Sequence, residues 1–219
     1  MAGAGFEWVG VDMQHGPVTI DVAAAMVQSI SVAGAVPLVR VPANEPWLIG
    51  QALDVGASGV IVPLVSTREE AERAAGACRY APAGTRSFGP LRAPGTEKVS
   101  CLVMVETREG VENVEEICAV PGVDGVYIGP WDLALSHGLD APGPETEPAI
   151  ERVLAACRRH RLAAGIHTGS GESARAYLDA GFSFAGVASD LDFLAQSARR
   201  ELGELPARAA PGGLVRIAP

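Results

Sequence analysis

Short apolar runs alternate with longer amphipathic segments along almost the whole chain. The runs are nearly continuous in Val, Ile, Leu and Ala, a pattern typical of parallel strands that are buried on both faces. This pattern predicts strands at residues 6–13, 36–41, 59–65, 101–105, 125–128, 163–167 and 184–188. The segments between them, rich in Ala, Leu, Glu and Arg, predict helices at residues 19–33, 46–55, 67–78, 108–119, 145–161, 173–180 and 191–202.

Strict alternation of strands and helices predicts an α/β fold with a parallel sheet, either closed as a barrel or open and doubly wound. The strand count favours a (β/α)8 TIM barrel that lacks its first strand and helix, because seven strands are predicted and a complete barrel has eight. The opening MAGAGFEW reads as the end of a helix that runs into a strand.

We assign residues 1–203 to the barrel domain and residues 204–219 to a C-terminal tail that contains Pro and Gly. An apolar run in the tail, within PGGLVRIAP, leaves two readings open. It fills the vacant strand position, or, as we favour, the tail is an unstructured extension. Because an open barrel exposes main-chain donors and acceptors, we expect the tail or a partner subunit to cover the gap.

Composition narrows the class of protein. The net charge of −9 argues against nucleic acid or an anionic membrane as the main partner, since both require clustered Lys and Arg. No apolar run approaches the length of a membrane span, and no signal peptide precedes the first strand. The four cysteines are Cys78, Cys101, Cys118 and Cys157, and they form no CxxC motif. This spacing favours reduced core thiols in a cytoplasmic protein.

Two carboxylates follow neighbouring predicted strands. Glu106 ends the run SCLVMV, and Asp132 comes shortly after the run VYI. Catalytic groups of parallel α/β folds collect at the carboxyl ends of strands, so these side chains are candidates for one pocket. Two hard oxygen ligands suit a divalent cation such as Mg or Mn, with water and substrate completing the shell. The alternative, equally open from the spacing, is that each carboxylate caps a helix.

Other polar residues also stand at predicted strand ends. His15 is a candidate general base, although a lone histidine at such a position is more often a hydrogen-bonded structural residue. Arg40 lies in an otherwise apolar strand, where a guanidinium needs a partner. It either pairs with a structural carboxylate or, as we favour, faces the pocket and binds an anion. With Asp12, Glu106 and Asp132, these residues form a convergent set.

The motifs VDMQHG, PLVRVP, ALDVGASGVIVPLV, RYAPAGTRSFG, VMVETREGVENVEEI and GVDGVYIGPWDLALS occur in this order. Together they resemble the HpcH/HpaI aldolase/citrate lyase family, with TIM barrels of the phosphoenolpyruvate/pyruvate type. The resemblance extends over about residues 4–200 and is strongest to the metal-dependent, class II pyruvate aldolases. These include 4-hydroxy-2-oxoheptanedioate and 2-dehydro-3-deoxyglucarate aldolases.

The resemblance implies that Glu106 and Asp132 bind a divalent metal ion, Mg, Mn or Co. Main-chain groups at Gly129, Pro130 and Trp131 would then bind the carboxylate of a 2-oxo acid. The implied reaction is the reversible aldol cleavage of a 4-hydroxy-2-oxo acid to pyruvate and an aldehyde, through a metal-bound pyruvate enolate.

The resemblance also gives roles to three further side chains. Arg40 would stabilise the enolate oxygen, and His15 would handle the proton of the 4-hydroxyl group. Asp54 would pair with this histidine from a neighbouring subunit, which implies a homo-oligomer, a trimer or hexamer, with sites near its interfaces. The only lysine, Lys98, precedes a strand, at the end away from the expected site, which disfavours a Schiff-base mechanism.

Three departures from the family bear on activity: Gln14 stands where an acidic residue is common, Met104 where a polar residue is common, and residues 87–99 form a shorter loop. Two alternatives remain. One is a malyl- or citramalyl-CoA-type lyase of the citrate lyase β-subunit branch, against which the absence of an evident basic patch counts. The other is a truncated, non-catalytic barrel subunit.

Overall fold

The computed structural model describes residues 1–89 and 98–203. The chain divides into two compact units, residues 1–187 and 188–219. The first unit contains a curled sheet whose strands are all parallel and follow one another in sequence order. The strands are β1 (Trp8–Asp12), β2 (Val36–Arg40), β3 (Gly59–Val62), β4 (Ser100–Val105), β5 (Gly125–Ile128), β6 (Ala163–Thr168) and β7 (Phe184–Val187).

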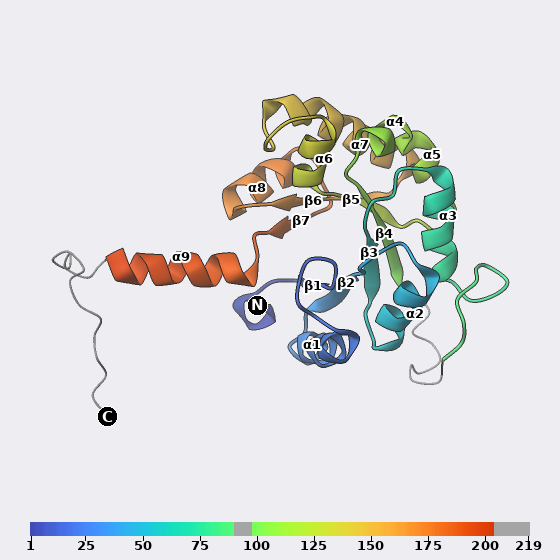
Figure 1. Cartoon of the computed structure of the whole chain (residues 1–219), viewed down its shortest axis with the longest axis horizontal. Coiled ribbons are helices and arrows are strands. Elements are labelled where there is room, and N and C mark those ends of the chain that lie inside the picture. Colours follow the sequence, from blue (N-terminus) through green and yellow to red (C-terminus); the bar gives the residue numbers. More distant parts are fainter. Residues whose placement is uncertain (90–97, 204–219) are drawn as a thin grey trace. The chain divides into compact units, whose positions relative to one another are not determined.

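Helices surround this sheet (Figure 1). They are η1 (Ala2–Ala4), α1 (Ile20–Val32), α2 (Pro46–Asp54), α3 (Arg68–Ala77), α4 (Arg108–Glu112), α5 (Val114–Cys118), α6 (Pro130–Ser136), η2 (Pro144–Thr146), α7 (Glu147–His160) and α8 (Gly171–Asp179). The second unit contains α9 (Asp190–Gly203). No helix in the described part of the chain is both long and apolar enough to cross a membrane.

The predicted strands and helices are confirmed, with two differences. The helix predicted at residues 108–119 is divided at Asn113 into α4 and α5. The short helix α6 was given no bounds in the prediction and entered it only through the alternative that Asp132 caps a helix. It begins at Pro130, a residue that suits the first turn of a helix because its fixed φ is already helical.

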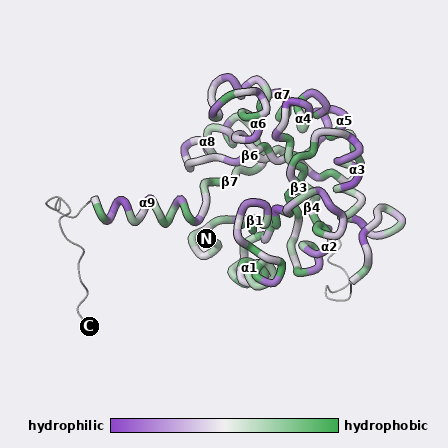
Figure 2. The backbone as a smooth tube through the Cα atoms, viewed as in Figure 1, coloured by the Kyte–Doolittle hydropathy of each residue, from purple (hydrophilic) through white to green (hydrophobic). Residues whose placement is uncertain are grey.

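The two faces of the sheet are buried in different ways. Outward side chains such as Val39, Val103 and Ile128 pack in the large core beneath the helices. Inward side chains form a second, smaller cluster that contains Leu38, Ile61, Leu102, Met104 and Tyr127. Side chains on a strand alternate between faces, so burial on both faces explains the continuous apolar runs. In Figure 2 the central strands are mainly green and the purple segments lie on helices and loops.

Strands β1 and β7 are the two edges of the sheet as described. Aromatic rings fill the interior beside these edges. The Trp8 ring lies edge-on to Phe184, with 5.8 Å between centroids, and Tyr127 stacks on Phe184 at the same distance. Gly186 makes room for this cluster, since a Cβ atom there would lie 2.3 Å from the Tyr127 hydroxyl oxygen. The sheet is therefore a curled half-barrel of the TIM-barrel type.

The assignment of residues 1–203 to one domain stays a prediction. The tail at residues 204–219, with its proposed extra strand, and most of the shortened loop lie outside the described residues.

Candidate active site

The predicted polar residues come together at one end of the sheet, the end formed by the carboxyl termini of the strands, and four strands contribute to it. We call this the carboxyl edge, to distinguish it from the edge strands β1 and β7. Asp12 and Arg40 are the last residues of β1 and β2 and are register partners. Glu106 directly follows β4, and Asp132 lies in the first turn of α6, just after β5. The sheet is parallel, so these ends lie at the same edge, as the sequence predicted.

Arg40 and Asp12 form a bidentate ion pair. Nε of Arg40 donates to Oδ1 at 2.8 Å, and a terminal nitrogen donates to Oδ2 at 2.6 Å. Burial by itself raises the pKa of Asp12, but hydrogen bonding and charge from Arg40, with two main-chain N–H groups, hold it below its usual value. Arg40 thus pairs with a carboxylate that is itself one of the predicted strand-end residues, and its role toward an anion in the pocket stays a prediction. It also lies close enough to Glu106 for their charges to interact.

Asp12 also fixes the loop that carries His15. Its Oδ1 accepts the main-chain N–H groups of Gln14 at 3.0 Å and His15 at 3.3 Å. Such a turn is typical of an Asp side chain that folds back on its own loop. The His15 side chain is exposed, and Oε1 of Gln14 is buried without a hydrogen-bond partner among the described residues. One carboxylate therefore orients both Arg40 and the histidine loop.

Glu106 is the buried acidic group of this edge, with 1% of its surface exposed. Its Oε1 accepts the main-chain N–H of Leu64 at 2.9 Å, whereas its Oε2 is buried and has no hydrogen-bond partner in the described part. Its pKa is raised to about 7, chiefly by burial and also by nearby Asp132, against the opposing effects of the Leu64 N–H and Arg40. An unsatisfied buried carboxylate oxygen is costly, which points to a missing partner at this position.

The residues here fit a divalent cation. Oε2 of Glu106 and the neighbouring Asp132 carboxyl offer hard oxygen donors, and no third His, Cys, Asp or Glu joins them within the described ranges. Water and substrate would complete the shell, as is usual for Mg²⁺. Glu106 is not a helix cap, because the N-terminus of α4 is capped by Thr107. Gly129 leaves space, since a Cβ atom there would lie 2.3 Å from this Oε2.

Asp54 is not brought to this edge within one chain. It ends α2, and Ser58, four residues on, donates to the main-chain oxygen of Pro37 at the start of β2. The end of α2 therefore lies near the amino ends of the strands. There Asp54 accepts a hydrogen bond of 2.6 Å from Arg86, a residue with 3% of its side chain exposed.

The remaining predicted residues take varied positions. Pro130 and Trp131 open α6 beside Asp132, and 59% of Trp131 is exposed. Met104 lies inside the curled sheet, and its terminal carbon would be 3.0 Å from a Cβ atom at position 129. All four cysteines are buried free thiols.

Sequence reasoning missed the role of Leu64. Its φ of 56° is unusual for a residue with a branched side chain, and this conformation belongs to the residue that directs its N–H at Glu106. A left-handed leucine costs ~1–2 kcal/mol, so it persists only where surrounding structure enforces it. The sequence PLVST gives no indication of this contact, because the donor is a main-chain group. Asp12 was named without a role. Its position at the end of the predicted strand that precedes the strand of Arg40 was the signal that the two side chains could meet.

Residues 1–197 match the family HpcH/HpaI aldolase/citrate lyase. The chain is 42% identical over 214 residues to a hydroxypyruvate/pyruvate aldolase of Rhizorhabdus wittichii, covering 91% of this chain and 85% of that protein. It is 38% identical over 222 residues to a 2-dehydro-3,6-dideoxy-6-sulfogluconate aldolase of Pseudomonas putida, covering 95% and 87%.

A solved structure agrees with these relatives. The crystal structure of a family protein from Burkholderia cenocepacia J2315 superimposes with a TM-score of 0.86 at 35% identity, covering 93% of this chain and 87% of that one. The chain belongs to the HpcH/HpaI aldolase/citrate lyase family, and it is accordingly an enzyme of the aldolase type.

Proposed function

We propose that the protein is a class II pyruvate aldolase that cleaves a 4-hydroxy-2-oxo acid to pyruvate and an aldehyde. The observation that carries this proposal is the buried, unsatisfied Oε2 of Glu106 beside Asp132, at the strand edge that also presents Arg40. The names of the relatives, aldolases of hydroxypyruvate and of sugar-derived acids, support the same class of substrate.

Glu106 and Asp132 would bind the divalent ion, with Mg, Mn and Co as candidates. When bound, such an ion acts as a Lewis acid that polarises a carbonyl oxygen. The main chain at the start of α6, at Gly129, Pro130 and Trp131, would receive the substrate carboxylate, with an N–H supplied by Trp131 and not by Pro130, because proline has none. A carboxylate is favoured there because main-chain N–H groups are unpaired at the start of a helix.

Arg40 supplies the charge that the reaction needs. Breaking the C3–C4 bond leaves its electron pair on the pyruvate half, so negative charge develops on the C2 oxygen. A guanidinium held rigidly by Asp12 is oriented before the reaction begins, and its NH1 group is not used in the pair. Arg40 therefore stabilises the enolate without moving.

His15 would accept the proton of the 4-hydroxyl group as the aldehyde carbonyl forms. Its exposed ring, on a loop fixed by Asp12, is free to reach a substrate or a bridging water. Asp54, at the other end of the chain's own sheet, would serve the histidine of a neighbouring subunit. We therefore propose a homo-oligomer, a trimer or hexamer.

Two finer structural proposals accompany this function. The seven strands would be those of a (β/α)8 barrel without its first strand and helix, which agrees with their unbroken sequential order. A cytoplasmic location agrees with four buried free thiols.

The test is release of pyruvate from 4-hydroxy-2-oxo acids after removal of metal and readdition of Mg, Mn or Co. Turnover is expected only with added metal and is expected to vanish in Glu106→Ala. Absence of metal-stimulated turnover of every such acid and of oxaloacetate would support the non-catalytic alternative. Cleavage of a CoA thioester in their place would support the citrate lyase branch.

A further inference from the structure

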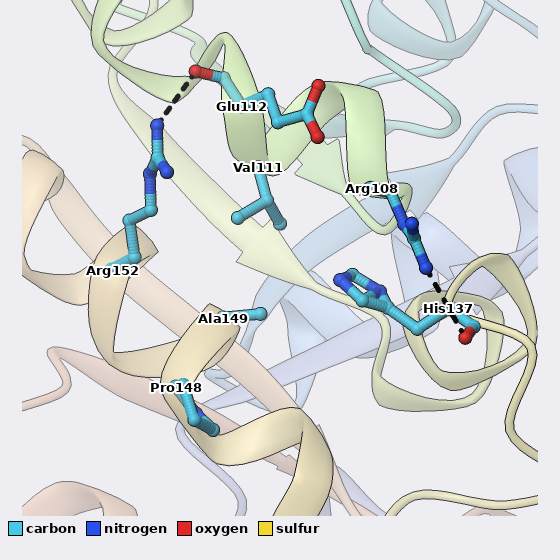
Figure 3. Close-up of a pocket in the computed structure, with 7 residues that line it drawn as sticks. All are labelled: Arg108, Val111, Glu112, His137, Pro148, Ala149 and Arg152. Atoms are coloured by element: carbon cyan, nitrogen blue, oxygen red, sulfur yellow. Dashed lines mark hydrogen bonds between the residues drawn. The ribbon is translucent and has the colours of Figure 1, made fainter.

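An open cavity at the surface has a lining that does not include Glu106 or Asp132. It has a volume of about 480 Å³ and opens between α4, the residue that follows α6, and the first turns of α7. Its lining includes Arg108 and Glu112 of α4, His137, and Arg152 of α7. Figure 3 shows Arg108 and His137 on one side of this space and Arg152 on the other.

The two arginines of this cavity have only neutral acceptors among the contacts described. Arg108 donates to the main-chain oxygen of His137 at 3.4 Å, and Arg152 donates to that of Glu112 at 3.0 Å. In Figure 3 the carboxylate of Glu112 extends away from Arg152. The cavity thus carries two guanidinium charges against one carboxylate, in a chain whose net charge is −9. Such a local excess attracts anions.

His137 adds a polar atom to the end where Arg108 lies. Its Nδ1 is 3.2 Å from the main-chain oxygen of Leu133, an acceptor, so Nδ1 carries the proton of this bond. Nε2 of such a neutral ring is an acceptor and does not donate to a carboxylate, so the two arginines are the charged donors of this cavity. The wall between the two ends is apolar and includes Val111 and Ala149.

We propose that this cavity binds a small organic dianion, with two carboxylates joined by a short hydrocarbon spacer. One carboxylate would lie against the planar donors of Arg152, and the other against those of Arg108. The spacer would pass along Val111 and Ala149. Guanidinium groups suit this ligand because they bind carboxylates through two parallel hydrogen bonds.

The test is a calorimetric titration of the full chain with succinate at low ionic strength, with a chelator present so that no metal is bound. Arg152→Gln and Arg108→Gln are each expected to weaken binding by about tenfold or more, which corresponds to ~1.4 kcal/mol. Arg175→Gln, which removes the same charge from an exposed position on α8, is expected to leave binding unchanged. Propionate, with one carboxylate, is expected to bind more weakly than succinate.

Because Arg108 is only two residues from Glu106, the titration is repeated with Glu106→Ala and Arg40→Ala. Succinate binding that survives both changes lies outside the active site. The proposal is wrong if wild-type protein does not bind succinate, if Arg152→Gln binds it equally well, or if Arg40→Ala abolishes binding. Tighter binding of inorganic phosphate would overturn the role of the spacer. None of these results depends on aldolase turnover, so the two proposals fail separately.

Discussion

The main-chain N–H of Leu64 donates to Oε1 of Glu106 at 2.9 Å, and this bond leaves the other carboxylate oxygen buried and unsatisfied. The bond comes from a neighbouring loop, after β3, so it fixes the direction of the carboxylate independently of β4. The remaining oxygen is aimed but unsatisfied, and its burial raises the pKa of Glu106 to about 7. The buried, unsatisfied carboxylate oxygen destabilises the folded protein until a bound cation supplies the missing partner.

The metal-free protein should therefore lose stability as the pH rises. The pKa of Glu106 is about 7 in the folded chain against 4.5 unfolded, so the stabilisation is full below 4.5 and is lost as the pH rises through 7. The shift corresponds to about 3 kcal/mol. Urea unfolding between pH 4.5 and 8, with a chelator, should show a flatter profile for Glu106→Gln, which keeps an acceptor for Leu64. Glu112→Gln, at an exposed position, should follow the wild type; equal profiles for all three would contradict the assignment.

Gly129→Ala should damage the metal site without unfolding the protein. A Cβ atom there would lie 2.3 Å from Oε2 of Glu106, so the carboxylate must turn away. We expect the metal concentration for half-maximal turnover to rise about 10- to 100-fold, as when a ligand loses its orientation. Gly171→Ala is the matched control, because nothing lies within 4 Å of a Cβ atom at the start of α8. Equal metal dependence in both variants would show that Gly129 does not shape the site.

The alternation of apolar runs was enough to predict the sheet, because the central strands β3, β4 and β5 are buried on both faces and their signal is local. The shared edge of Asp12, Arg40, Glu106 and Asp132 followed from one rule, that parallel strands end together. The metal-ligand role of Glu106 and Asp132 and the roles of Arg40 and His15 came from the family resemblance, and they stay predictions.

Other features depend on tertiary structure that no local pattern records. The bond from Leu64 uses a main-chain donor in a left-handed conformation, and leucine gives no sign of it. The pairing of Asp54 with Arg86 joins α2 to a loop 32 residues later, so the local sequence around either residue does not predict the contact. The cavity beside Arg152 arises where α4 and α7 meet, and these helices are far apart in sequence.

Arg40→Ala should impair catalysis more than stability. Loss of the guanidinium should cost about 3 kcal/mol of transition-state stabilisation, on the order of a hundredfold in kcat. Arg79→Ala is the control, since Arg79 also pairs with a carboxylate, that of Asp124 at 2.7 Å, and 23% of its side chain is exposed against 24% for Arg40. Asp124 precedes β5, at the opposite end of the strands. Steady-state kinetics should show a kcat defect for Arg40→Ala alone, and a defect confined to KM would argue against the enolate role.

Mixing two inactive variants tests whether Asp54 serves a neighbouring subunit. Within one chain, Asp54 lies at the opposite end of the sheet from the loop of His15, so the two can share a site only between chains. Asp54→Asn keeps an acceptor for Arg86, and with His15→Ala it should recover about a quarter of wild-type activity after subunit exchange, because random assembly leaves that share of sites intact. His15→Ala mixed with Glu106→Gln should recover nothing, since both residues belong to the same chain's site. If the first mixture stays as inactive as its parts, Asp54 has no role across the interface.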